Sequence, residues 1–336
     1  MKPGRRLETI ASGTAMRSYS TRIVTAVLGT VLASLSLAQP YPNKPIKAIV
    51  PYGVGQATDV MCRVFLDQMR VGLNQPIVIE NRPGAGGNIG GAEAAKATPD
   101  GYTVLCTGNA THVGNPFLYD NMGFDPEKDL APVNVVAGTG YVLLAGNKLK
   151  GKSVAEIVAM AKAAPKPLTM GVASTTAHVL YGMFTDATKV ELVRVPYAAG
   201  NRSLFTDLMR GDLDLVIEAM PSAMAPITNG QVAAIAVTNP TRTPFLPDVP
   251  TFKESGVDIT LLGWNAFYVP RGTPPEVVST LNRAANEALK DAELRRRFAT
   301  VASEPIGGSS ADLANMIRSD RAKYEPMIRA LGLKAQ

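Results

Sequence analysis

The sequence contains very few of the residue types that bind metals or act as nucleophiles. Its 336 residues include two histidines and two cysteines. No pair among His112, His178, Cys62 and Cys106 has the usual spacing of zinc ligands. The G-x-S-x-G and H-E-x-x-H motifs of hydrolases are also absent. We therefore expect no metal site, no cofactor and no enzymatic activity.

Long apolar runs are also missing after residue 38, so no segment of the remaining chain predicts a membrane span. Before that point, arginines precede an apolar run over residues 23–37, which is too short to cross a bilayer. Ser36-Leu37-Ala38 has the small-x-small pattern of a cleavage site. We predict a secretory signal peptide over residues 1–38, cleaved near Ala38, with translation starting at Met1 or at Met16.

Little excess charge remains once this leader is removed. The whole chain has a formal net charge of +6, and residues 1–38 contribute five basic side chains and one acidic side chain. The mature chain therefore has a formal net charge of +2, and this small charge does not favour a nucleic-acid partner.

The two cysteines leave two interpretations open. Cys62 lies in a predicted helix and Cys106 ends a predicted strand. Export would place them in a compartment that permits disulfides. A bridge needs a Cα–Cα separation that the sequence does not supply, so two adjacent buried thiols are the simpler interpretation and a disulfide is the alternative.

Two strand–loop–helix units occur in succession near the start of the mature chain. Their strands are residues 46–50 and 76–80, and each is followed by a loop rich in glycine and other small residues. The helices that follow are predicted to begin near Val60 and Ile89. Such loops leave backbone N–H groups exposed at a helix N-terminus, where the helix dipole favours an anion. The pattern predicts an anion site, although the same glycines could serve only to form tight turns.

Strand-like and helical patterns alternate through the rest of the chain, which indicates an α/β fold. Further strands are predicted at residues 102–106, 133–136, 141–145, 168–173, 192–196, 213–217, 233–237 and 263–269. Further helices are predicted at residues 153–164, after the 174–176 turn, at 202–210, from a capping box at Thr273 and Glu276 to about 290, at 291–301 and at 311–331.

Ordered motifs give the chain a family resemblance. They are Tyr41-Pro42-Asn43-Lys44-Pro45-Ile46, Val50-Pro51-Tyr52, Thr58-Asp59, Glu80 to Gly90, Pro99 to Thr103, Val195-Pro196-Tyr197, Asp207 to Gly211, Leu246 to Thr251 and Pro270 to Pro274. Through them the chain resembles the periplasmic solute-binding receptors of tripartite tricarboxylate transporters, the Bug-type or TctC-type receptors of Gram-negative bacteria. The resemblance covers nearly all of residues 41–333.

The resemblance implies a two-lobed, type II periplasmic binding protein-like fold with two Rossmann-like α/β lobes. It places the two hinge crossings near 138–141 and 263–264. The first lobe would then comprise residues 39–138 and 264–336, and the second lobe residues 139–263. The implied function is the capture of a small carboxylate in the cleft of a monomer, closed by a hinge motion. The partners would be membrane permease subunits, with sensing as an alternative role to uptake.

Ligand contacts are expected where loops of both lobes face the cleft. The candidates are Tyr52, Gly53, Gln56, Thr58, Asp59, Ala85, Gly86, Asn109, Ser174, Thr175, Thr176, Tyr197, Ala199, Gly200 and Glu218. Thr58 and Asp59 could equally cap a helix, and we expect the main role of Asp59 to be structural. Glu218 could receive a ligand amine or pair with a loop. His178 is expected to pack inside its lobe.

One motif favours a different class of protein. Residues Gly146 to Ser153 match the P-loop pattern G-x-x-x-x-G-K-[ST] between a predicted strand and a predicted helix. Secretion would remove the chain from ATP, and Lys148 and Lys150 are bulkier than the residues of a phosphate cradle. Ser153 and Glu156 also explain the segment as a capping box. A P-loop nucleotide-binding protein, or a secreted α/β enzyme acting on a carboxylate, is the alternative function.

Overall fold

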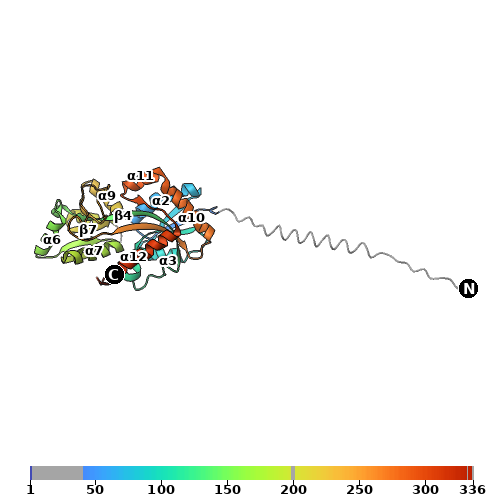
Figure 1. Cartoon of the computed structure of the whole chain (residues 1–336), viewed down its shortest axis with the longest axis horizontal. Coiled ribbons are helices and arrows are strands. Elements are labelled where there is room, and N and C mark those ends of the chain that lie inside the picture. Colours follow the sequence, from blue (N-terminus) through green and yellow to red (C-terminus); the bar gives the residue numbers. More distant parts are fainter. Residues whose placement is uncertain (2–40, 198–200, 331, 335–336) are drawn as a thin grey trace. The chain divides into compact units, whose positions relative to one another are not determined.

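The computed structural model describes Met1 and residues 41–197, 201–330 and 332–334. The predicted signal peptide, apart from Met1, lies outside the described residues, as do the candidate ligand residues Ala199 and Gly200. From Lys44 onward the chain forms one compact unit, shown in Figure 1. None of the helices in the described ranges combines the length and the hydropathy that a bilayer crossing requires.

Two groups of strands build this unit, and we call them and their helices the first and second lobes. In the first lobe β1 lies between β2 and β3 in parallel, and β9 continues the sheet antiparallel to β3. In the second lobe β5 lies between β6 and β7 in parallel. The strands are β1 (Ile46–Val50), β2 (Ile77–Asn81), β3 (Thr103–Gly108), β4 (Leu130–Ala145), β5 (Leu168–Val172), β6 (Leu192–Pro196), β7 (Leu215–Ala219), β8 (Ala233–Val237), β9 (Leu262–Pro270) and β10 (Glu304–Pro305).

One long strand, β4, passes through both lobes. Its first part, as far as Gly140, pairs antiparallel with β9. From Tyr141 onward it pairs with β7 on one side and β8 on the other. The sequence analysis predicted two separate strands here, at residues 133–136 and 141–145. That prediction is wrong: Gly140 is needed for a close approach, since a Cβ there would collide with the Asn239 side chain.

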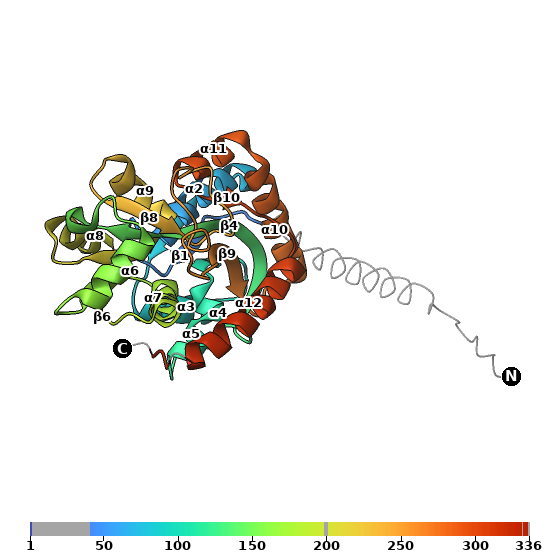
Figure 2. The ribbon, with the colours of Figure 1, turned by 60° about the vertical axis from the view of Figure 1, so that its left-hand side comes forward.

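Helices flank the sheet in both lobes. Those of the first lobe are α2 (Ala57–Leu73), α3 (Asn88–Ala95), α4 (Ala110–Val113), α5 (Asn115–Leu118), α10 (Pro275–Lys290), α11 (Ala292–Thr300) and α12 (Ser310–Ala330). Those of the second lobe are α6 (Val154–Ala163), α7 (Thr175–Thr188), α8 (Asn201–Arg210) and α9 (Met220–Thr228). Short 3₁₀ turns lie at Ala85–Gly87 and Asn147–Leu149. In Figure 2, α12 lies beside α4, and it also contacts α7 of the second lobe.

Several helix starts differ from the prediction. Helix α2 begins at Ala57, so Thr58 and Asp59 lie in its first turn and do not cap it. Ser174 caps α7, and the predicted turn residues Thr175 and Thr176 are already helical. The capping box predicted at Thr273 is also wrong, since its hydroxyl donates a hydrogen bond to the carbonyl of Pro270 at 2.8 Å. Pro274 precedes the helix and Pro275 is its first residue, so the helix begins at proline without a side-chain cap.

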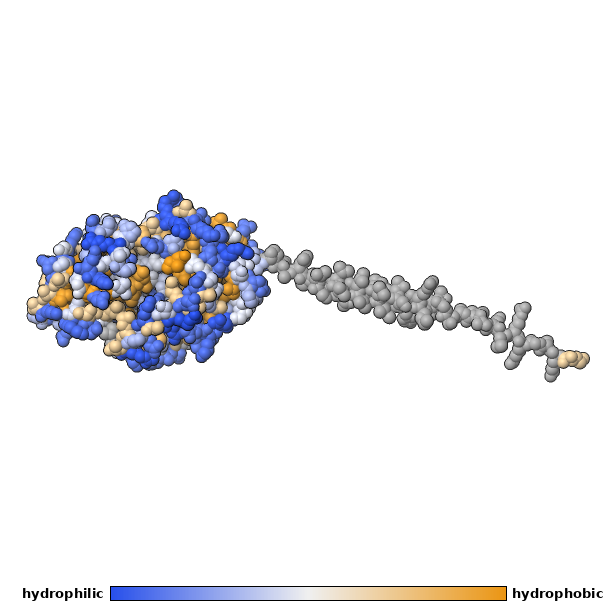
Figure 3. All heavy atoms as spheres, viewed as in Figure 1, coloured by the Kyte–Doolittle hydropathy of each residue, from blue (hydrophilic) through white to orange (hydrophobic). Residues whose placement is uncertain are grey.

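Two groups of buried apolar side chains form the core of the protein. Phe184 and Phe252 meet edge to face in the larger group, with ring centroids 6.0 Å apart. Val142, Leu144 and Leu208 belong to the smaller group in the second lobe. On the face shown in Figure 3, hydrophobic residues are scattered among hydrophilic ones. Burial of the apolar faces therefore accounts for the association of helices with the sheet.

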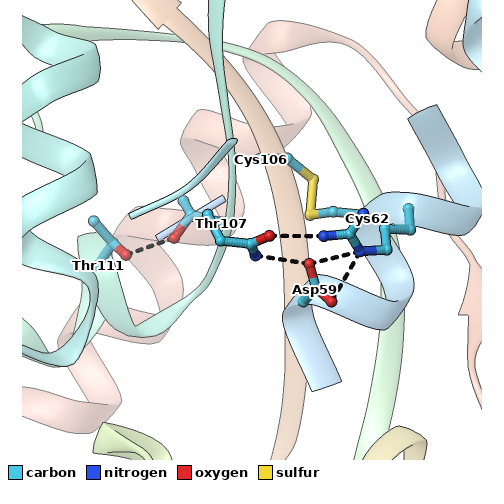
Figure 4. Close-up of a disulfide and its surroundings, with 7 residues drawn as sticks. Asp59, Cys62, Cys106, Thr107 and Thr111 are labelled. Carbon is cyan, nitrogen blue, oxygen red and sulfur yellow. Dashed lines mark hydrogen bonds and ion pairs between the residues drawn. A yellow bond between two sulfur atoms is a disulfide. The ribbon is translucent and has the colours of Figure 1, made fainter. Parts of the chain in front are cut away.

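Cys62 and Cys106 form a disulfide, with a Cα–Cα separation of 6.1 Å. The simpler interpretation from the sequence, two free buried thiols, is therefore wrong. Helix α2 packs against β3 closely enough to bring the two residues together. The local sequence around either cysteine does not predict this tertiary contact. Figure 4 shows the bridge next to Asp59, which projects from the same helix.

Candidate functional site

A cavity of about 40 Å³ lies between the lobes, where β4 and β9 leave one lobe for the other. We call it the inner cavity. Its described lining is Tyr52, Gln56, Ala57, Thr58, Gly108, Asn109, Ala110, Thr139, Tyr141, Ser174, Thr176, Glu218, Ala219, Gly263, Trp264 and Asn265. Seven of these are candidates named from the sequence: Tyr52, Gln56, Thr58, Asn109, Ser174, Thr176 and Glu218.

A second cavity of about 190 Å³ continues from the first, and we call it the outer cavity. Tyr52, Gln56 and Ser174 line both, so these three side chains separate the two spaces. Four more predicted residues reach only the outer cavity: Ala85, Gly86, Thr175 and Tyr197. The candidates therefore divide into an inner and an outer group along a single cleft.

Two predicted residues line neither cavity. The N–H of Gly53 donates to Gln56 Oε1 at 2.8 Å, which closes the β1–α2 loop on itself. Asp59 is buried and accepts hydrogen bonds from Gly55 N at 2.9 Å, Arg63 Nε at 2.9 Å and Asn81 Nδ2 at 2.8 Å. These contacts fix the loop against α2 and β2, so Asp59 positions the residues that do reach the cavity.

Three helices point their N-termini at the inner cavity. Ala57 and Thr58 form the first turn of α2. Ser174 caps α7 by accepting a hydrogen bond from Ala177 N at 3.1 Å. Ala219 precedes α9, and its N–H donates to Glu218 Oε1 at 2.9 Å. Because helix N-termini carry partial positive charge, this arrangement can hold anions without a basic side chain.

Neutral hydroxyl groups supply further donors. Burial raises the pKa of Tyr52, although side-chain hydrogen bonds from Thr111 and Thr107 oppose the shift. Burial also raises the pKa of Tyr141, and the nearby Glu218 adds to the increase. Both phenols therefore remain protonated at neutral pH and can donate to a ligand.

Glu218 is the one acidic side chain among the described residues that line the inner cavity. It is 3% exposed, and its Oε1 also accepts a hydrogen bond from Ser222 Oγ at 3.2 Å. No lysine, arginine or histidine belongs to that described lining. An anionic ligand would therefore meet backbone donors, hydroxyls and amides, together with one carboxylate of the protein.

The sequence analysis missed several residues that line the inner cavity. Tyr141, Trp264 and Asn265 come from the two crossing strands. Asn265 Nδ2 is buried without a hydrogen-bond partner, and Trp264 Nε1 donates to Asp320 Oδ2 at 2.7 Å. In the sequence, these residues stand out only by lying at or next to the expected hinge crossings. Strands that cross between lobes border the cleft, so residues at the crossings could have been expected to line it.

His178 lies against the outer cavity, contrary to the expectation that it packs inside its lobe. Burial, and secondarily the charge of Arg194, lowers its pKa to about 4. The ring is therefore neutral at pH 7 and adds no positive charge to the cleft. It reaches the cavity because it lies one turn after Ser174 on α7, with its backbone N–H bonded to the Ser174 carbonyl at 3.0 Å.

The P-loop-like segment has the structure of a capped helix start. Glu156 N donates to Ser153 Oγ, and Glu156 Oε2 accepts from Ser153 N at 2.9 Å, which completes a capping box. Lys152 Nζ lies 3.1 Å from Glu156 Oε1. Lys148 Nζ donates to the Gly211 carbonyl at 3.2 Å. The basic side chains are thus bonded to neighbouring parts of the second lobe.

Comparisons with known proteins agree with this geometry. Residues 61–333 match the model of the family described as "Tripartite tricarboxylate transporter family receptor". The chain is 32% identical to Protein BugT of Bordetella pertussis, covering 92% of this chain and 97% of that protein. Rpa4515 of R. palustris, solved with adipate, superposes with a TM-score of 0.84 at 31% identity, covering 88% and 99% of the two chains.

A further solved relative is MatC (Rpa3494) from Rhodopseudomonas palustris, with bound malate. It is 26% identical, with a TM-score of 0.80 and coverage of 86% of this chain and 100% of that chain. These structures confirm the two-lobed binding-protein fold, and the matched profile confirms the resemblance seen in the sequence motifs. The chain belongs to the tripartite tricarboxylate transporter receptor family of periplasmic solute-binding proteins.

Proposed function

We propose that this receptor captures a small carboxylate in the cleft between its lobes and presents it to the permease subunits of a membrane transporter. The observation that carries the proposal is the convergence of the N-terminal turns of α2 and α7 on the inner cavity, one from each lobe. A carboxylate there would gain from two helix dipoles and from neighbouring hydroxyl groups. It would thereby hold the two lobes together.

The solved relatives support this ligand class. Rpa4515 was solved with adipate and MatC with malate, and both are carboxylates. In our chain the proposed ligand residues are the candidates that line the two cavities: Tyr52, Gln56, Thr58, Ala85, Gly86, Asn109, Ser174, Thr175, Thr176, Tyr197 and Glu218. Tyr141 and Asn265 join them from the crossing strands.

Binding would act through closure of the cleft. We assign residues 39–138 and 264–336 to the first lobe and residues 139–263 to the second, with β4 and β9 as the hinge. A ligand that contacts both lobes binds the closed form better than the open form and so shifts the population toward closure. The permease would then recognise the closed receptor.

The remaining parts of the proposal concern the setting of the receptor. We propose that residues 1–38 direct export and are removed near Ala38, which leaves a monomer in the periplasm. The protein would perform no chemistry on its ligand. Local contacts support this function over the P-loop alternative. They engage the side chains of Lys148, Lys152 and Ser153 in a hydrogen bond, an ion pair and a helix cap, respectively.

A thermal shift screen of the mature protein tests the proposal. The probes are dicarboxylates, aromatic acids, amino acids, and ATP with magnesium. We expect a rise of several degrees with one class of acid, because a ligand that binds only the folded state stabilises it by mass action. Trp264 is the only tryptophan in the sequence and lines the inner cavity, so its fluorescence should change with the same ligand. Stabilisation by ATP–magnesium alone would contradict the proposal.

A further inference from the structure

A further cavity lies in the first lobe, outside the cleft, and has a volume of about 300 Å³. We call it the α12 cavity. Residues of α4, α12 and the loop before β4 line it, together with residues at the start of β4 and at the end of β9. Helix α12 lies beside α4 in Figure 2, which brings these segments together. None of its described lining residues lines the inner or the outer cavity, so it is a separate site.

The floor of the α12 cavity is buried and largely apolar. Leu130 and Ile317 belong to it and are 1% and 7% exposed. In the same lining, the ring of His112 stacks on that of Tyr268, with ring centroids 4.0 Å apart and an angle of 7° between the planes. An apolar group that covered this floor would gain free energy, because its own surface and that of the floor would leave water.

Polar atoms of the two stacked rings have no partner in the chain. The Tyr268 hydroxyl and both ring nitrogens of His112 are buried without a hydrogen bond of normal geometry. Burial lowers the pKa of His112 to about 3, although the Pro126 carbonyl opposes the shift. The ring is therefore neutral at pH 7 and brings no charge to the floor. Buried polar groups normally have partners in native proteins, and a molecule bound on this floor would supply them.

Two arginines at the rim, Arg271 and Arg318, have neutral partners. Both are exposed. Arg271 donates to two backbone carbonyls of the loop before β4, and Arg318 donates to Asn315 Oδ1. No carboxylate of the described chain therefore neutralises these two guanidinium groups. The side chain of Glu127, the one acid in the described lining, forms an ion pair with Arg321. The rim thus carries a net positive charge.

An apolar floor below a positive rim suits an amphipathic anion. Guanidinium groups bind sulfonate, carboxylate and phosphate groups through charge-assisted hydrogen bonds. A small hydrophilic anion would gain nothing from the floor, and a cation would be repelled by the rim. The volume holds an apolar body of about ten heavy atoms, at the roughly 30 Å³ that a water molecule occupies in the liquid. The cavity therefore matches a small molecule in size and charge.

We propose that the α12 cavity binds a small organic acid, whose apolar body packs on Leu130 and Ile317 and whose acid group contacts Arg271 and Arg318. The proposal goes beyond the carboxylate capture described above, because this site and the cleft share no described lining residue. The receptor would hold two ligands at once, one between its lobes and one within the first lobe.

Calorimetric titration of the mature protein with 2-naphthalenesulfonate tests the proposal. This probe combines a ten-carbon apolar body with a permanent negative charge. The neutral 2-naphthalenesulfonamide keeps the body, and methanesulfonate keeps the charge. We expect the probe to bind about tenfold more tightly than either analogue, since each exposed guanidinium contact contributes up to about fivefold and the body adds the gain from the floor.

Substitutions on α12 locate the probe. Ala314 is half-buried and lines the cavity, so Ala314→Trp should fill the space and abolish measurable binding. Arg318→Gln should weaken binding about two- to fivefold, as the loss of one exposed charged contact. Arg295→Gln is the matched control: Arg295 is an exposed arginine of α11 outside the described lining, and its loss should leave the affinity unchanged.

A substitution in the cleft distinguishes the two sites. Gly86→Ala narrows the outer cavity and should leave binding of the probe unchanged. Loss of binding in Gly86→Ala, with Ala314→Trp unaffected, would place the probe in the cleft and overturn the proposal. Affinities that Ala314→Trp and Arg318→Gln leave unchanged would overturn it as well, and so would no binding by the unaltered protein. Arg318→Gln decides the matter where Ala314→Trp fails to fold. Carboxylate capture in the cleft stands or falls by its own thermal shift screen.

Discussion

The hydroxyl of Thr175 donates a hydrogen bond of 2.7 Å to Oδ1 of Asn115, and this contact joins the two lobes. Asn115 lies in α5 of the first lobe, and its own amide donates to the Gly86 carbonyl at 2.9 Å and to Asn88 Oδ1 at 2.6 Å. Thr175 lies at the start of α7 in the second lobe. The bond therefore connects the glycine-rich loop after β2 to the opposite wall of the outer cavity.

Removal of this bond should weaken ligand binding with little effect on the fold. Thr175→Val keeps the shape of the side chain and removes the donor. A hydrogen bond of this kind contributes about 0.5–1.5 kcal/mol. If the bond forms only on closure, affinity falls by about 2- to 12-fold. Stopped-flow measurements of Trp264 fluorescence should show faster ligand dissociation.

Thr228→Val is the control for this variant. The Thr228 hydroxyl bonds to the carbonyl of Met224 within α9 and is exposed. Its loss should leave affinity and dissociation rate unchanged. Equal affinities for Thr175→Val and the unaltered protein would show that the bond between the lobes does not contribute to ligand capture.

Gly86 provides a test of the space in the outer cavity. Its φ is +62°, so any side chain is strained there, at a cost of about 1–2 kcal/mol. A Cβ would also lie 2.7 Å from the Tyr119 hydroxyl and 2.9 Å from Thr175 Oγ1. Gly86→Ala should therefore destabilise the protein and also weaken ligand binding, because the added methyl group keeps the lobes apart.

Gly151→Ala is a matched control. Gly151 also has a positive φ, of +78°, but a Cβ there meets no atom within 4 Å. This variant should lose stability in urea unfolding through the same backbone strain and keep its ligand affinity. If both variants lost affinity equally, general destabilisation would explain the result and obstruction of the cleft would not.

Much of the fold was predictable because local patterns carry it. Each predicted strand lies on a strand of the structure within a few residues, although two of them are parts of the single strand β4, since apolar runs bounded by turns identify buried strands. Helix α9 was missed. It begins at Met220-Pro221 and contains Pro226, so its composition argues against a helix, yet Met220, Pro221 and Ala223 are buried. Tertiary packing overrode the local preference.

The site shows the same division between local and long-range information. Tyr52, Gln56, Ser174 and their neighbours follow strands, and turn chemistry identifies such positions. Asn265 lies in the middle of β9, and only its pairing with Gly108 and Ala137 brings it to the cavity. The sequence carries no local signal of that pairing, and the same is true of the disulfide between α2 and β3.

The buried histidine of the cleft predicts how stability depends on pH. The pKa of His178 is lowered to about 4 by burial, against 6.5 in an unfolded chain. Above pH 6.5 neither state binds the proton. Between pH 6.5 and pH 4 only the unfolded state is protonated, so stability falls by up to about 3 kcal/mol over that range. His178→Asn should reduce the difference between the unfolding free energies measured in urea at pH 7 and pH 4.5. An unchanged difference would show that His178 titrates normally in the folded protein.

The last prediction separates a receptor from a P-loop protein by two neighbouring substitutions. Ser153 caps α6, so Ser153→Ala should cost about 0.5–2 kcal/mol in urea unfolding and leave ligand affinity intact. Lys152 forms a partly exposed ion pair with Glu156, which contributes little, so Lys152→Ala should change stability by less than about 0.5 kcal/mol. Neither residue lines the two cavities, and titration with the acid found in the screen should give the same affinity for both variants. In a P-loop, by contrast, this lysine would neutralise phosphate charge, and its loss would abolish binding. A folded Lys152→Ala protein without ligand binding would therefore refute the receptor function and favour the nucleotide-binding alternative.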